Sequence, residues 1–145
     1  VSCTSSGIID MLDYYNINVS GKNAVVIGRS LLVGKPVSML LNNRNATVTM
    51  CHSKTENLSE ITRNADIIVI AIGVPNFLTS DMVKDGAVVI DVGINRVNGK
   101  LVGDAAFEEL KEKCSYITPV PGGVGQMTVY ELYENVYKTL KLKNM

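Results

Sequence analysis

The chain has 145 residues, of which 46% are hydrophobic and 19% are charged, and these proportions are typical of one folded domain. Fourteen Lys and Arg balance fourteen Asp and Glu, so no overall positive charge favours nucleic acid or an anionic membrane surface. No apolar run approaches the roughly 20 residues of a membrane span, and we expect neither of these partners. Three widely spaced cysteines and one histidine predict no metal site and favour a reducing, cytoplasmic compartment.

Helix-like and strand-like segments alternate along the chain. Within residues 1–20, Ser5 and Ser6 can cap a helix whose apolar residues recur at helical spacing. Runs rich in β-branched residues, which predict strands, follow at 24–28, 46–51, 66–72 and 87–92. The segments long enough for crossover helices are 35–43, 56–64 and 79–85. This order predicts an α/β fold over residues 1–145, a Rossmann-like single domain with a doubly wound parallel sheet.

Two more elements follow the fourth strand. Asn98-Gly99, a dipeptide typical of tight hairpin turns, lies between 94–97 and 100–102 and predicts a small β-ribbon. Apolar residues at helical spacing predict a C-terminal helix over 126–142. Because doubly wound sheets bind ligands at the carboxyl ends of their strands, we expect the loops after the four strands to share one cleft.

The loop after the first strand has features of a dinucleotide-binding loop. Gly28 suits a tight turn, Ser30 is small enough to let a ligand approach the backbone, and Gly34 permits close contact with the helix. Arg29 lies between the first two of these residues. The strict G-x-G-x-x-G spacing is broken, so this loop alone favours a dinucleotide loop and an ordinary strand-to-helix turn about equally.

The end of the second strand bears on the choice of cofactor. Residues 51–55, Cys-His-Ser-Lys-Thr, contain no carboxylate of the kind that holds the ribose hydroxyls of NAD. Ser53 can donate to a phosphate, while His52, Lys54 and Arg29 supply positive or potentially positive charge, which favours the extra 2′-phosphate of NADP. Ser53 and Thr55 can also cap the helix expected to begin near Glu56, and both roles can coexist.

No side chain is identified as a resident catalytic group. Cys3, Cys51 and Cys114 are predicted to be small buried apolar residues, because no acid or base is placed to activate them. Asp66 and Asp91 lie at strand ends, where roles in turns and caps are common.

Four motifs occur in order along the chain, namely Gly28-Arg-Ser-x-x-Val-Gly-Lys-Pro36, Cys51-His-Ser-x-Thr55, Asp91-Val-Gly-Ile-Asn95 and Pro119-Val-Pro-Gly-Gly-Val-Gly125. Together they resemble the family of bifunctional methylenetetrahydrofolate dehydrogenases and methenyltetrahydrofolate cyclohydrolases. The resemblance implies NADP binding by Gly28, Arg29, Ser30, Ser53 and Ile94. It also implies a loop on the folate side made of Pro121, Gly122, Gly123, Val124 and Gly125. The resemblance further implies a homodimer that forms through this domain. The ribbon edges at 94–97 and 100–102 would then reach the second subunit.

In that family the catalytic Tyr and Lys, and most folate contacts, lie in an amino-terminal domain that this chain does not contain. The chain opens on Val1 rather than Met. We therefore expect the NADP-binding part of an enzyme that oxidises 5,10-methylenetetrahydrofolate and hydrolyses the methenyl product to 10-formyltetrahydrofolate, with no turnover by the 145 residues alone.

Three residues depart from the family pattern. Ser2 and Ser5 stand where prolines are usual and are expected to loosen the interdomain linker, whereas Gln126 replaces a proline after the glycine-rich loop. Two alternatives remain open at this point. One is a NAD-specific monofunctional relative, and the other is a stand-alone module for nucleotide binding or dimerisation without catalysis.

Overall fold

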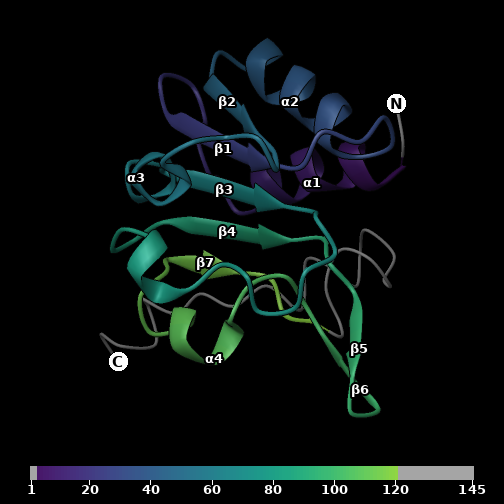
Figure 1. Cartoon of the computed structure of the whole chain (residues 1–145). Helices are drawn as coiled ribbons and strands as arrows, with labels where there is room; N and C mark the ends of the chain where they lie inside the picture. Colours follow the sequence, from purple (N-terminus) through teal and green to yellow (C-terminus); the bar gives the residue numbers. More distant parts are fainter. Residues whose placement is uncertain (1–2, 121–145) are drawn as a thin grey trace.

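A five-stranded parallel sheet forms the centre of the molecule (Figure 1). The computed structural model describes residues 3–120, and the helix expected over 126–142 lies outside that range. The strands, in their order across the sheet, are β2 (Thr47–Cys51), β1 (Asn23–Ile27), β3 (Ile67–Ile70), β4 (Val88–Asp91) and β7 (Tyr116–Ile117). The strand order reverses between β1 and β3, so the sheet is doubly wound and the predicted α/β fold is confirmed.

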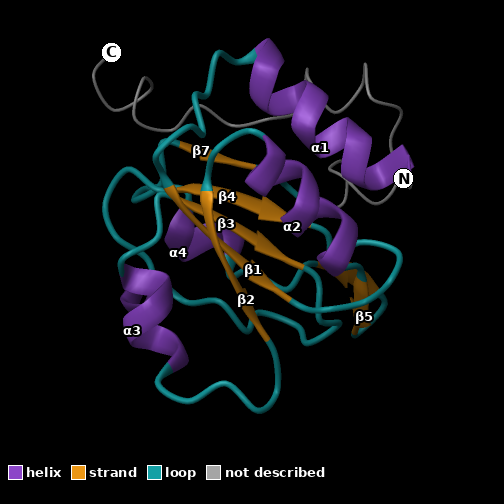
Figure 2. Cartoon of the chain, turned by 90° about the horizontal axis from the view of Figure 1, so that it is seen from above, coloured by secondary structure: helices purple, strands orange, loops and turns teal. Residues whose placement is uncertain are grey.

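Helices cover both faces of the sheet (Figure 2). The helices on one face are α1 (Cys3–Tyr14) and α2 (Gly34–Asn43), and those on the other face are α3 (Leu58–Arg63) and α4 (Phe107–Leu110). Strand β1 contributes to both layers, because Ala24 and Val26 pack with α1 and α2 whereas Val25 and Ile27 pack on the opposite side. Successive side chains of a strand alternate between its faces, so a strand covered twice is apolar throughout.

The prediction of a helix over 79–85 is wrong. Only a 3₁₀ turn, η1 (Ser80–Met82), forms there, and Val83 is already extended with φ −131°. The Thr79 hydroxyl bonds the Asp81 carboxylate, a local side-chain interaction that competes with a regular helix. Two elements were not predicted, α4 and β7, because runs of four and two residues are too short to show a period.

The first helix corrects one expectation about Ser5. Helix α1 begins at Cys3, so Ser5 lies inside the helix rather than at its cap. Its exposed fraction is 0%, which places it in the packed layer, while its effect on a linker stays a prediction. The other substituted residue of this segment, Ser2, lies outside the described residues.

The predicted β-ribbon is confirmed and projects from the body of the molecule (Figure 1). Strands β5 (Asn95–Val97) and β6 (Lys100–Val102) pair antiparallel. Asn98 and Gly99 make the turn with φ of 51° and 79°, the left-handed region that this dipeptide accepts readily. Across residues 3–120, we find no helix with the length and apolarity to cross a membrane.

Candidate cofactor-binding site

The register of the sheet brings four loops to one edge. Ile27 at the end of β1 lies opposite Cys51 of β2 and Ile70 of β3, and Ile70 in turn lies opposite Asp91 of β4. Hydrogen bonds continue past the strand ends, since the Gly28 N–H donates to the Cys51 carbonyl at 2.9 Å. The loops that follow these strands therefore start side by side, as the strand order predicts.

Two glycines shape the loop after β1. Gly28 has a φ of +124°, and a Cβ at this position would lie 2.5 Å from the Ala71 carbonyl oxygen of the neighbouring loop. A Cβ on Gly34 would overlap the backbone of Gly28. Both positions require glycine, so the tight turn and the close contact with α2 that the sequence predicts are present.

Ser30 has a role in this loop that the sequence analysis missed. Its Oγ accepts the N–H groups of Val33 at 3.1 Å and Gly34 at 3.4 Å, and its carbonyl accepts the Lys35 N–H at 2.9 Å. The first N–H groups of α2 are therefore already bonded inside the protein. The backbone N–H groups of residues 29–32 donate to no acceptor within residues 3–120, so they are the donors left for an anion. The Ser30 hydroxyl keeps its own proton to donate.

The segment after β2 folds into a closed turn. The Thr55 Oγ1 accepts the His52 N–H at 2.8 Å, and the Thr55 N–H donates to the His52 carbonyl at 3.0 Å. The His52 Nδ1 accepts the Lys54 N–H at 3.2 Å. The turn leaves the Ser53 side chain exposed at its tip, with no hydrogen bond to any described residue.

The capping role considered for Ser53 and Thr55 is wrong. Helix α3 begins at Leu58, and its N-cap residue is Asn57, which has a φ of 56° and makes no side-chain cap bond. Thr55 closes the 52–55 turn instead. Of the two interpretations of Ser53, the one that remains is contact with a ligand, and this stays a prediction.

The charges at the ends of β1 and β2 are mostly positive. Arg29, Lys35 and Lys54 are exposed there, and the first carboxylate that follows is Glu56. No carboxylate lies within residues 28–35 or 51–55. This part of the edge therefore suits a ligand with several negative charges, such as a pyrophosphate with a further phosphate.

Ile94 lies farther along the same edge, just after β4, and 39% of its surface is exposed. The residues on both sides of it are held by buried carboxylates. Gly93 donates its N–H to Asp91 Oδ1 at 2.9 Å, and Asn95 donates from Nδ2 to Asp104 Oδ1 at 2.9 Å. Burial raises the pKa of Asp91 to about 6, against the hydrogen bonds that three backbone N–H groups donate to this carboxylate.

The remaining residues of the sequence analysis have structural roles where they are described. Asp66 accepts the Asn23 N–H at 2.9 Å and pairs with Lys84, and these bonds hold the pKa of the Asp66 carboxyl below its usual value. Cys51 and Cys114 are buried free thiols, and burial raises the pKa of both. Among the described residues, no group of three or more His, Cys, Asp and Glu could hold a metal.

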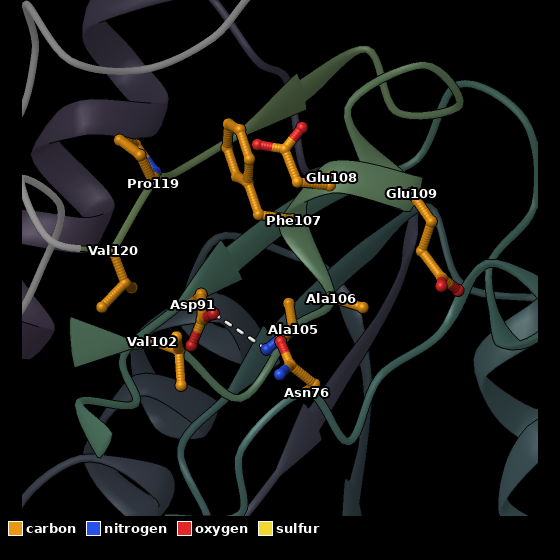
Figure 3. Close-up of a pocket in the computed structure, with 11 residues that line it drawn as sticks. Asn76, Asp91, Val102, Ala105, Ala106, Phe107, Glu108, Glu109, Pro119 and Val120 are labelled. Carbon is orange, nitrogen blue, oxygen red and sulfur yellow. Dashed lines mark hydrogen bonds between the residues drawn. The ribbon is translucent and has the colours of Figure 1, made fainter. Parts of the chain in front are cut away.

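A pocket of about 400 Å³ lies beside β4 and α4 (Figure 3). Phe107, Pro119 and Val120 line it with apolar groups, and Asp91 reaches it from the strand end. The predicted folate-side loop, 121–125, and Gln126 follow Val120 directly and lie outside the described residues.

Comparison with known proteins assigns the family. The profile of the tetrahydrofolate dehydrogenase/cyclohydrolase NAD(P)-binding domain matches residues 2–144. The bifunctional protein FolD of Campylobacter hominis is 65% identical over 142 residues, which are 97% of this chain and 50% of that protein. The chain therefore spans about half the length of the curated relatives that it matches.

Solved structures agree. The crystal structure of the bifunctional FolD of Campylobacter jejuni superposes with a TM-score of 0.85 at 53% identity, covering 98% of this chain and 50% of that one. The Trypanosoma brucei enzyme, which was solved with NADP cofactor and an inhibitor, gives 0.82 at 40% identity and covers 99% of this chain and 52% of that one. The chain belongs to the tetrahydrofolate dehydrogenase/cyclohydrolase family and corresponds to its NAD(P)-binding domain.

Proposed function

We propose that the chain binds NADP along the edge formed by the loops after β1, β2 and β4, with Gly28, Arg29, Ser30, Ser53 and Ile94 as the contacts. It would serve the oxidation of 5,10-methylenetetrahydrofolate and the hydrolysis of the methenyl product to 10-formyltetrahydrofolate. The observation that carries the cofactor choice is the end of β2, where an exposed serine and cations stand in place of a carboxylate. The relative from Trypanosoma brucei with NADP bound supports it.

The residues present fit such a cofactor. Gly28 makes the tight turn that such a loop needs at the end of β1, where a Cβ would meet the Ala71 carbonyl oxygen. The free N–H groups of residues 29–32 and the Ser30 hydroxyl suit a pyrophosphate. Ser53 and Arg29 suit the 2′-phosphate, since a hydroxyl donor and a guanidinium both bind phosphate oxygens well.

The division of chemistry follows from this arrangement. When bound, the nicotinamide supplies the hydride acceptor. The described residues would bind and orient it, and the partly exposed Ile94 would offer it an apolar contact. The loop of Pro121, Gly122, Gly123, Val124 and Gly125 is proposed for the folate side. Catalytic groups would come from the other half of such an enzyme, so an absorbance assay of the isolated chain should show no turnover.

The experiment that tests the cofactor choice is calorimetric titration with NADP and NAD. We expect the parental chain to prefer NADP, and Ser53→Glu to weaken NADP binding by about tenfold or more, which is about 1.4 kcal/mol, because the new carboxylate repels the 2′-phosphate. The matched control is Ser20→Glu, which places the same charge on an exposed residue that precedes β1, at the opposite edge of the sheet, and should change nothing. A parental chain that prefers NAD would overturn the proposal.

We also propose a homodimer and a cytoplasmic location. The β5–β6 sheet has only two strands, so its outer edges at Asn95–Val97 and Lys100–Val102 are unpaired among the described residues. Unpaired strand edges invite pairing with another chain. The location rests on the three cysteines, an odd number that lie far apart in the sequence.

A further inference from the structure

Asp104 is fixed on every side although no sequence motif pointed to it. Its exposed fraction is 0%. Oδ2 accepts the backbone N–H groups of Ile72 at 2.7 Å and Gly73 at 2.9 Å, and Oδ1 accepts the side-chain amide of Asn95 at 2.9 Å. Its backbone N–H donates to Asp91 Oδ1 at 3.0 Å. One carboxylate thus connects the loop after β3 with the base of the β5–β6 ribbon.

The Asp104 carboxylate is tightly packed against the backbone of the loop after β4. A Cβ at Gly93 would overlap the Asp104 carboxyl group, so the loop after β4 passes directly over it. Gly73, whose N–H it accepts, has a φ of +73°. A buried carboxylate costs free energy unless hydrogen bonds satisfy it, and here three donors do so. The loops after β3 and β4 are therefore held in one relative position by a single side chain.

Ile94 depends on this arrangement. With 39% of its surface exposed, it is only partly held by its own packing. The residue before it is bonded to Asp91, and the residue after it is bonded to Asp104. We propose that Asp104 is a positioning residue, which acts through Asn95 and the Ile72–Gly73 backbone to hold Ile94 against the nicotinamide end of the cofactor. This inference rests on the proposed cofactor site.

The hydrogen-bond pattern permits a test by exchange of groups. In Asn95→Asp, two carboxylates face each other where a 2.9 Å hydrogen bond stood, and their repulsion displaces the residue after Ile94. In the double variant Asn95→Asp/Asp104→Asn, the amide at position 104 donates to the carboxylate at position 95. Its oxygen still accepts from Ile72 and Gly73, so the connection is restored with the net charge unchanged.

The measurements are NADP affinity by calorimetry, the melting temperature, and the ¹⁵N–¹H NMR shifts of Ile72 and Gly73 without cofactor. At pH 7.5 we expect Asn95→Asp to weaken NADP binding by about tenfold, and the double variant to recover most of this loss. Both amide shifts should move in the single variant, because the N–H groups of Ile72 and Gly73 donate to the displaced carboxylate.

Failure of the inference differs from failure of the proposed function. If the parental chain does not bind NADP, the cofactor site is wrong and the role of Asp104 falls with it. If the parental chain binds NADP but Asn95→Asp lowers only the melting temperature, Asp104 is a stabilising residue and not a positioning one. A double variant that binds as weakly as Asn95→Asp also overturns the proposal, because the exchange of groups then restores nothing.

Discussion

Asp91 predicts an unusual dependence of stability on pH. The residue is 2% exposed, and burial raises its pKa from 3.8 to about 6. A carboxyl whose pKa is raised by folding binds its proton more tightly in the folded state, so protonation favours folding. This contribution is fully present below pH 3.8, the value expected for the unfolded chain, and is lost as the pH rises through 6. The chain should therefore become less stable between weakly acidic and neutral pH.

The magnitude follows from the two pKa values. The difference between 3.8 and about 6 is about 2.2 units, and each unit is worth about 1.36 kcal/mol, so the full loss is about 3 kcal/mol. About 2 kcal/mol of it falls between about pH 4.5 and 7, the range in which a urea titration is practical. This is a substantial part of the stability of an ordinary domain.

Asp91→Asn isolates the effect, because it removes the titration while it keeps the shape of the side chain. Urea unfolding of both chains at several pH values gives the difference in unfolding free energy, in which the contributions of all other groups cancel. Asp81→Asn is the control, since the Thr79 hydroxyl holds the pKa of the exposed Asp81 carboxyl below its usual value, and its contribution changes only in more acidic solution. The reasoning is refuted if the difference between the parental and Asp91→Asn chains is constant or rises with pH.

Two further predictions concern the loop after β1 and the assembly. Gly34→Ala should destabilise the chain by about 2–3 kcal/mol in urea unfolding, because its Cβ overlaps the Gly28 backbone, whereas Gly21→Ala should cost only about 1 kcal/mol, since that glycine has open space and a positive φ. Equal effects of the two substitutions would contradict the close contact between the Gly28 turn and α2. Light scattering should report a particle of twice the chain mass, and a monomer at high concentration would contradict the proposed homodimer.

The fold could be predicted largely because three strands, β1, β3 and β4, are covered on both faces. Strands Ile67–Ile70 and Val88–Asp91 are fully buried. A strand that is buried on both faces has a nearly continuous apolar sequence, which can be recognised without a structure. Tyr116–Ile117 is too short for such a signal, although it pairs with β4 in the same way. The 79–85 segment misled the prediction because polar side chains that bond locally have no signature distinct from a capped helix.

The candidate site likewise contains parts that could be predicted from the sequence and parts that could not. The turn around Ser30 and the 52–55 turn are built from hydrogen bonds between residues at most five positions apart, so their glycine, serine and threonine residues are visible as local motifs. Asp104 instead contacts residues 9, 31 and 32 positions away. No local sequence pattern predicts the role of Asp104, because its hydrogen-bond partners come close to it only when the sheet has formed.

Because Ser53 lies in a locally closed turn and Ile94 lies between residues held by long-range hydrogen bonds, substitutions at the two places should affect cofactor binding differently. The 52–55 turn closes through Thr55 and His52, so Ser53 at its tip can be replaced without breaking a hydrogen bond of the protein. The residues on both sides of Ile94 have no such freedom, because Asp91 and Asp104 together accept hydrogen bonds from the loops after β3 and β4 and from the base of the ribbon. Substitutions at position 53 should therefore alter the choice between NADP and NAD while the melting temperature stays constant. Substitutions at position 104 that cannot accept these bonds should lower affinity for both cofactors and stability together, because the same side chain holds the loops and places Ile94.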